Sequence, residues 1–166
     1  IAAMFECGCA GVSRGRVEQY LYPRCRHGLG TGGLKQAQAR EWSSMLLIKM
    51  NDVTMLQAGF LQVGCAGYPV MQGLTVGGVT PEGEDAVNEL SYLILDAEEE
   101  VGLTAEELVI SISAQNHDRH VERACEVARN LSGRLTFVSD AYTGAAPVPV
   151  GLPGQLDRDD IPLGTN

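Results

Sequence analysis

A strand–helix–strand pattern in the second half of the chain constrains the fold most. Residues 108–113 (LVISIS) and 134–138 (RLTFV) are short apolar runs rich in β-branched residues, which is typical of strands. Between them Asp118 can cap a helix whose apolar residues share one face: Val121, Ala124, Cys125, Ala128 and Leu131. Two strands joined through one helix within about 30 residues form a parallel, right-handed unit. The pattern therefore predicts an α/β fold.

Two more helices and one more strand are expected before this unit. Residues 34–56 lack Gly and Pro, and residues 45–48 (MLLI) together with Met50 are apolar on all sides of the predicted helix, which is typical of a helix buried by its neighbours. A second helix is expected to open at Thr80-Pro81 and to end at Gly102, with a core stripe made of Val87, Leu90, Ile94, Ala97 and Val101.

The connecting segments are also predicted from local signals. Residues 74–76 (LTV) are expected to form a short strand. Pro23 is expected to end the aromatic segment that begins at Arg16, and residues 28–33 (GLGTGG) are interpreted as a flexible link.

Charge and composition exclude several classes of function. Twelve basic residues against 21 acidic ones give a net charge of -9, which disfavours binding to nucleic acid or to an anionic membrane. Aromatic residues are only 5% of the chain, so a base-stacking surface is not expected. No run of about 18 apolar residues and no basic leader is present, so a cytoplasmic location is expected.

No catalytic constellation is complete in the residues themselves. The five cysteines are irregularly spaced and are interpreted as reduced thiols, and the three histidines give no metal-ligand spacing, so no metal is expected. A nucleophile elbow of the form G-x-S-x-G is absent, and residues 28–33 lack the Lys-Ser/Thr of a phosphate loop. From the residues alone, the chain is a cytosolic α/β domain or part of one.

Three blocks in order resemble a known family. Residues 74–96 (LTVGGVTPEGEDAVNELSYLILD), residues 15–23 (GRVEQYLYP) and residues 38–52 (QAREWSSMLLIKMND) are similar to segments of the glycyl radical enzymes of the pyruvate formate-lyase-like superfamily. In the first block the matching positions are Gly77, Gly78, Pro81, Gly83, Asp85, Ala86, Asn88, Glu89, Leu90, Ser91 and Tyr92. The resemblance favours the dehydratase and decarboxylase branches.

The resemblance implies a fold and a chemistry. The expected fold is part of a barrel of parallel half-sheets surrounded by helices, with residues 1–166 lacking both the N-terminal part and the C-terminal glycine-radical domain. In such enzymes a cysteine becomes a thiyl radical, and the radical is stored on a glycine. A partner activase that uses S-adenosylmethionine and an iron–sulfur cluster installs it. The resemblance further implies anaerobic metabolism of a small-molecule substrate, with no directly bound cofactor, and a homodimeric full-length parent.

Few site residues follow from the resemblance. Residues 161–166 (IPLGTN) match the start of the family's catalytic loop, and Thr165 stands at the position of the radical cysteine. Because an O–H bond is far stronger than an S–H bond, the hydroxyl of Thr165 cannot take the place of the cysteine thiol as the hydrogen-abstracting radical centre. Tyr68, Met71 and Gln72 precede the Gly-Gly pair and match the part of the family that contributes to the substrate pocket.

Three hypotheses about function remain. In the first, the chain is part of a glycyl radical lyase or dehydratase, and this part is inactive by itself. In the second, it is a non-catalytic α/β assembly or binding domain derived from the same fold. In the third, it is an unrelated α/β binding domain.

Overall fold

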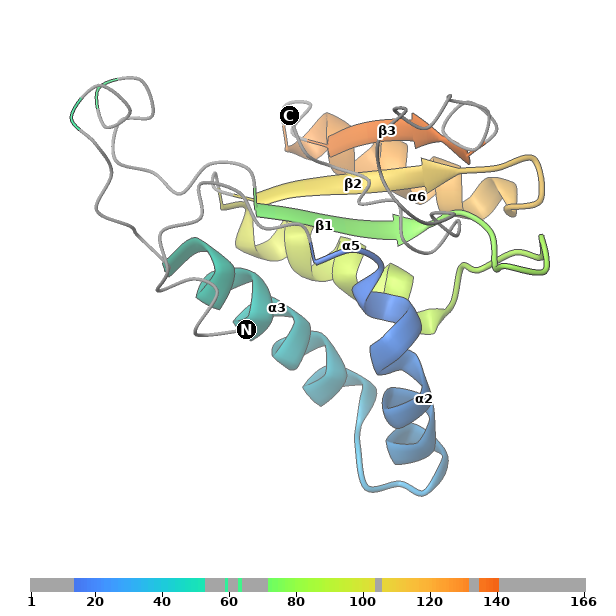
Figure 1. Ribbon diagram of the computed structural model, residues 1–166. Coiled ribbons are helices and arrows are strands. Elements are labelled where there is room, and N and C mark those ends of the chain that lie inside the picture. The colour runs from blue at the N-terminus through green and yellow to red at the C-terminus, as the bar shows by residue number, and fades with distance from the viewer. Residues whose placement is uncertain are drawn as a thin grey trace, which may run out of the picture.

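The computed structural model describes residues 14–52, 72–103, 106–131 and 135–140, together with the single residues 59 and 63. Within these residues a parallel sheet of order β1-β2-β3 packs against helices (Figure 1). The elements in chain order are α2 (Val17–Gly30), α3 (Gln36–Asp52), β1 (Gln72–Gly77), α5 (Glu89–Val101), β2 (Glu106–Ile112), α6 (Asp118–Asn130) and β3 (Leu135–Ser139). No helix in this described part is long and apolar enough to cross a membrane.

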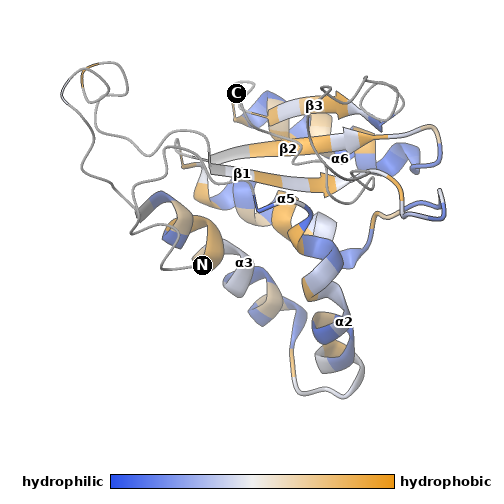
Figure 2. Cartoon of the chain, in the orientation of Figure 1, coloured by the Kyte–Doolittle hydropathy of each residue, from blue (hydrophilic) through white to orange (hydrophobic). Residues whose placement is uncertain are grey.

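The parallel sheet confirms the predicted α/β fold. Leu74 of β1 pairs with Leu108 of β2, and Leu108 in turn pairs with Leu135 of β3. Helix α5 connects β1 to β2, and α6 connects β2 to β3, as expected for parallel neighbours. Alternate strand residues share one buried core with both helices: Leu74, Val76, Leu108, Ile110, Leu135, Leu93, Ile94, Ala97, Ala124 and Val127. Figure 2 shows this apolar character along the strands.

Helix α5 begins later than predicted. The expected start at Thr80-Pro81 is wrong, because residues 80–84 form a turn in which Gly83 N–H donates to Thr80 O over 2.9 Å. The helix starts at Glu89, where the Asn88 side chain accepts from two backbone N–H groups and Ser91 completes a capping box. Its predicted end is confirmed, since Gly102 takes the left-handed conformation there.

Pro23 does not end helix α2, contrary to the prediction. The helix continues to Gly30, so the expected link 28–33 begins inside it. Pro23 is exposed, so the hydrogen bond that it removes lies on the solvent side of the helix. Beyond it, Cys25 and Leu29 pack on the core, and this packing stabilises the last two turns.

In helices α3 and α6 the buried residues differ from those predicted. In α3 only Leu47 and Met50 of the apolar cluster are deeply buried, whereas Met45 is 59% exposed, so the expectation of a helix buried on all sides is wrong. In α6 the N-cap is His117 rather than Asp118, and Cys125 is exposed. The buried residues of α6 are His120, Ala124 and Val127.

Removing the cap of α5 tests the role of Asn88. We expect Asn88→Ala to lower the free energy of unfolding by about 1 kcal/mol, because two N–H groups of the first turn lose their acceptor. Urea unfolding followed by circular dichroism measures the change. The control is Glu122→Ala on the exposed face of α6, which should change it by less than about 0.5 kcal/mol; equal effects of the two variants would contradict the capping role.

Candidate functional site

The candidate site lies where the three parallel strands end. In open parallel sheets, ligands bind outside the carboxyl ends of the strands. Here that edge holds the loop of residues 77–88, called the glycine loop below, which joins β1 to α5. Polar side chains from the start of α2, the β2–α6 turn and the end of β3 all reach it.

Arg16 connects the start of α2 to the first turn of the glycine loop. Its two terminal nitrogens donate to Gly77 O over 2.8 Å and to Val79 O over 2.6 Å. Just before it, Gly15 accepts a hydrogen bond from Thr75 N of β1 over 3.0 Å, which fixes this segment beside the strand. The rigid guanidinium therefore bonds two carbonyls that are 61 and 63 residues away in the sequence.

Glu18 and Gln19 bind both ends of the same loop. The Glu18 side chain is fully buried, and its Oε1 accepts from Gly77 N over 3.1 Å and from Gln19 Nε2 over 3.0 Å. Gln19 Nε2 also donates to Ala86 O over 2.7 Å. Burial raises the pKa of Glu18 from 4.5 to about 7, despite the opposing hydrogen bond from Gln19 and the charge of Arg16.

The opposite side of the glycine loop is bonded to Ser111 of β2, to the β2–α6 turn and to the residue that follows β3. Val79 N donates to Asp140 Oδ2 over 2.9 Å, and the Ser111 hydroxyl donates to the other oxygen of Asp140. Asn116 Nδ2 donates to Gly78 O and to Asp85 Oδ1, each over 2.7 Å. The loop is thus fixed from both sides.

Gly77 and Gly78 allow the chain to turn in this crowded place. Gly77 has φ +89°, and a Cβ there would lie 2.5 Å from His120 Nε2 and 2.6 Å from Ser111 O. Gly78 has φ +78°, and its Cβ would lie 2.6 Å from Asp140 Oδ2. Only glycine fits both the backbone conformation and the space.

His120 is fully buried beneath this turn. Its ring meets the ring of Tyr92 edge-on, with 6.2 Å between the centroids. Desolvation lowers the pKa of His120, and the charge of Asp85 opposes this shift. The imidazole is therefore held in its neutral form at neutral pH.

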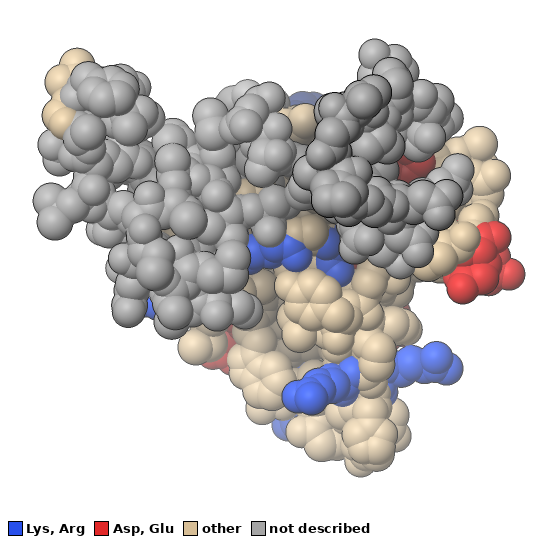
Figure 3. All heavy atoms as spheres, viewed as in Figure 1, with Lys and Arg blue, Asp and Glu red and all other residues tan. Residues whose placement is uncertain are grey.

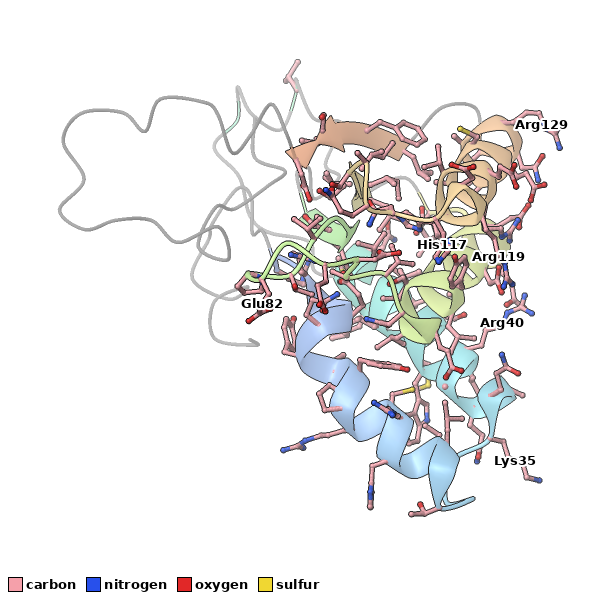
Figure 4. The ribbon with its side chains drawn as sticks, turned by 90° about the vertical axis from the view of Figure 1, so that its right-hand side faces the viewer. Lys35, Arg40, Glu82, His117, Arg119 and Arg129 are labelled. Atoms are coloured by element: carbon pink, nitrogen blue, oxygen red, sulfur yellow. The ribbon has the colours of Figure 1, made fainter. Side chains whose placement is uncertain are left out.

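A cleft of about 510 Å³ with both polar and apolar lining opens beside the glycine loop, in front of the first turn of α5. Its lining includes Gln19, Tyr22, Thr80, Asp85, Asn88, Glu89, Tyr92 and His117. Figure 4 shows His117 and Arg119 near each other at the start of α6, with Glu82 at the far tip of the loop. Acidic side chains gather over that tip in Figure 3, where Glu82 and Glu84 are exposed. This charge disfavours an anionic ligand.

In the described part of the chain, these side chains hold a backbone loop and do not form a complete catalytic constellation. Among the described residues, no group of three or more His, Cys, Asp or Glu side chains is placed to bind a metal ion. Ser111 bonds to Asp140 rather than to a histidine base. The carboxylates of Glu18, Asp85 and Asp140 each accept backbone N–H groups of the loop or its neighbours.

Of the four predicted site residues, only Gln72 lies in the described part of the chain. Tyr68, Met71 and Thr165 lie outside the described residues. Gln72 opens β1 at its amino end, opposite the glycine loop, and its side chain is not described.

Sequence reasoning missed four residues of the site: Ser111, Asn116, His120 and Asp140. Ser111, Asn116 and Asp140 lie at or just after strand ends, and that position is the signal that could have identified them. No such signal marks His120, which lies in the first turn of α6.

Residues 1–146 match the family model described as pyruvate formate lyase-like. The chain belongs to this family. Trans-4-hydroxy-L-proline dehydratase of Clostridioides difficile is 31% identical over 74% of this chain and 16% of its own length. Isethionate sulfite-lyase of Nitratidesulfovibrio vulgaris is 30% identical over 78% of this chain and 16% of its own length. The chain thus spans about a sixth of these relatives.

Solved structures that align with this chain support the same family assignment. A glycyl radical enzyme from Archaeoglobus fulgidus aligns with a TM-score of 0.71 at 27% identity, over 93% of this chain and 20% of that one. The B12-independent glycerol dehydratase from Clostridium butyricum aligns with a TM-score of 0.71 at 29% identity, over 82% of this chain and 18% of that one. They confirm the predicted fold class and the resemblance to glycyl radical enzymes.

Substituting two glycines that have similar φ angles distinguishes the energetic cost of steric crowding from that of backbone strain. Gly77 has φ +89° and Gly83 has φ +86°, but a Cβ at Gly83 would meet nothing within 4 Å. We expect Gly83→Ala to cost about 1–2 kcal/mol of unfolding free energy, from the left-handed backbone alone. Gly77→Ala should cost about 1–3 kcal/mol more, because His120 and Ser111 must move.

Urea unfolding of both variants measures this difference. Equal losses of stability would contradict the close approach of His120 to Gly77.

Proposed function

We propose that this chain is part of the catalytic barrel of a glycyl radical lyase or dehydratase that acts on a small molecule. One observation supports this most directly: the two sequence blocks that resemble the family, 15–23 and 74–96, bond to each other through Arg16, Glu18 and Gln19. Relatives named as a dehydratase and a sulfite-lyase indicate the reaction class.

In this proposal the described residues build and fix a part of the barrel wall. The glycine loop is bonded on one side to Arg16, just before α2, and on the other to Asn116 in the β2–α6 turn and to Asp140 just after β3. The network gives such an enzyme a rigid strand end at the carboxyl edge of the sheet. Tyr68, Met71 and Gln72, which precede the Gly-Gly pair in the sequence, are proposed as substrate-pocket residues.

We further propose that the chain is inactive by itself. Thr165 matches the position of the radical cysteine, and its hydroxyl cannot supply a thiyl radical. The radical-bearing segment of the type Arg-Val-x-Gly-Tyr does not occur within the 166 residues. The complete enzyme would also need the radical activase, and the resemblance implies a homodimer.

A chimera tests membership in a working barrel. The matching segment of the Clostridium butyricum glycerol dehydratase, to which this chain aligns at 29% identity, is replaced by residues 14–140, and the chimera is activated anaerobically with that enzyme's own activase. We expect assembly and a glycyl radical signal in electron paramagnetic resonance. Because Arg16 bonds two loop carbonyls, Arg16→Ala in the chimera should abolish assembly.

Extending the replaced segment to residue 166 tests Thr165. This longer chimera should lose dehydration of glycerol, and Thr165→Cys should restore it, since only the thiol forms the required radical. A matched control is Thr31→Cys at an exposed helix end, which should restore nothing. Failure of the first chimera to assemble would favour the alternative, a non-catalytic assembly domain derived from the same fold.

A further inference from the structure

An apolar groove lies between α2 and α3, and residues of α5 form its inner side (Figure 1). It is called the α2–α3 groove below and has a volume of about 330 Å³. Three helices contribute its apolar side chains: Leu21 and Cys25 from α2, Trp42 and Leu46 from α3, and Leu90 and Ile94 from α5. None of the described residues that line it belongs to the glycine loop.

The groove continues from the molecular surface into the hydrophobic core. Val17, Leu34 and Ala39 line it and also belong to the buried core. At its mouth, Trp42 is 60% exposed and Leu21 is 40% exposed. A contiguous apolar surface on a folded protein marks an interaction site. We therefore expect another apolar element to complete the core at this place.

The exposed residues of α3 favour a helix as that element. Trp42, Met45 and Ile48 are exposed apolar residues that recur at every third position of α3. Such a row forms a ridge that packs between the ridges of a second helix, with the two axes about 20° from alignment. Apolar residues of this spacing are also what docking of a helix in a groove uses. The groove therefore fits a helix that runs roughly along α3.

The charges around the groove are basic, although the chain as a whole has a net charge of -9. Arg24 lines the groove, and within the described residues it forms no ion pair. Figure 3 shows Lys and Arg side chains at one end of this face, below uncharged ones. Against the single exposed acid Glu41, the exposed basic residues of α2, α3 and their link are Arg24, Arg26, Lys35, Arg40 and Lys49. A helix with acidic side chains beside its apolar face matches this charge.

Two other occupants fit the groove less well. A bilayer receives an apolar face that protrudes, whereas this surface is concave, and the net charge of the chain repels anionic lipid. A second copy in a two-fold dimer would place the same basic helices against each other.

We propose that the α2–α3 groove is filled by an amphipathic helix of the parent polypeptide, from outside these 166 residues, whose apolar face is flanked by acidic side chains. The chain spans 16% of the length of the relatives it matches, so most of a protein of that size is available to supply the helix. The source of the helix rests on the proposed function, whereas the chemistry of the groove does not depend on it.

The fluorescence of Trp42 tests the chemistry of the groove in the 166-residue chain. Trp42 is the single tryptophan of the sequence, so its emission reports the groove alone. The probes are two synthetic helical peptides with the same leucine face, one flanked by glutamate and the other by lysine. The glutamate peptide should shift the emission to shorter wavelength and bind at least about tenfold more tightly than the lysine peptide. Equal affinities would overturn the proposal.

Two pairs of variants control for unspecific binding. Leu21 in the groove and Phe137 on β3 are 40% and 41% exposed. Leu21→Ala should weaken binding of the glutamate peptide about tenfold, whereas Phe137→Ala should leave it unchanged. Arg24→Glu should weaken it about fivefold, and Arg129→Glu, at the end of α6, should change it less than twofold.

Circular dichroism of each variant establishes that it is folded, and the charge pair supplies the test if Leu21→Ala does not fold. Equal effects within either pair would overturn the proposal.

Two further measurements cover the other occupants. Analytical ultracentrifugation should find no dimer that Leu21→Ala dissociates, since such a dimer would assign the groove to a second copy and overturn the proposal. Vesicles of phosphatidylserine and phosphatidylcholine should not shift the Trp42 emission. A shift that Leu21→Ala abolishes would assign the groove to a membrane and likewise overturn it.

The glycerol dehydratase chimera that carries residues 14–140 tests the source of the helix. Hydroxyl-radical footprinting with mass spectrometry compares the oxidation of single residues in the chimera and in the 166-residue chain. In the assembled chimera, oxidation of Trp42 and Met45 should fall to the level of Met50, which is 2% exposed. An assembled chimera in which Trp42 and Met45 stay as reactive as in the 166-residue chain would overturn the proposal.

Failure of the chimera to assemble would instead contradict the proposed function. The peptide titration needs no chimera and still decides the chemistry of the groove, so the two failures are distinguishable.

Discussion

The hydrogen bonds of Arg16 to Gly77 O and Val79 O are the interaction on which the rest of this structure depends. They join the start of α2 to the end of β1, and thereby set where the sheet stops and where the glycine loop turns. A carbonyl at a strand end needs a partner when it is buried, and a planar guanidinium supplies two donors at fixed spacing. Glu18 and Gln19 extend the same contact to both ends of the loop.

This arrangement gives a physical meaning to the motif residues. The Gly-Arg-x-Glu-Gln block and the Gly-Gly block are far apart in the sequence, yet their members are direct hydrogen-bond partners. The described members of these blocks fix backbone geometry at the carboxyl edge of the sheet. The same arrangement buries the Glu18 carboxyl and the His120 imidazole with polar atoms that have no hydrogen-bond partner among the described residues.

Much of the fold could be predicted because local periodicity reports it directly. The strands around Leu74, Leu108 and Leu135 and the central part of the stripe on α5, Leu90, Ile94 and Ala97, were predicted from the apolar pattern, since burial requires that pattern. Val87, at the start of the predicted stripe, lies before the helix. The start of α5 was missed because Thr80-Pro81 satisfies the same local rule as Asn88, and only the turn at Gly83 decides between them. Helix α2 passes Pro23 because packing of Cys25 and Leu29 outweighs the lost hydrogen bond.

By itself the sequence determined the parallel α/β pattern, the end of α5 at Gly102 and the family resemblance. These rest on local spacing and on residue identities, which are visible in one dimension. Only the tertiary structure decided which side chains meet at the glycine loop. Arg16, Asn116, His120 and Asp140 converge there from four segments, because parallel strands end at one edge and the helices return to it. Burial at that edge, and the protonation states it imposes on Glu18 and His120, cannot be read from spacing.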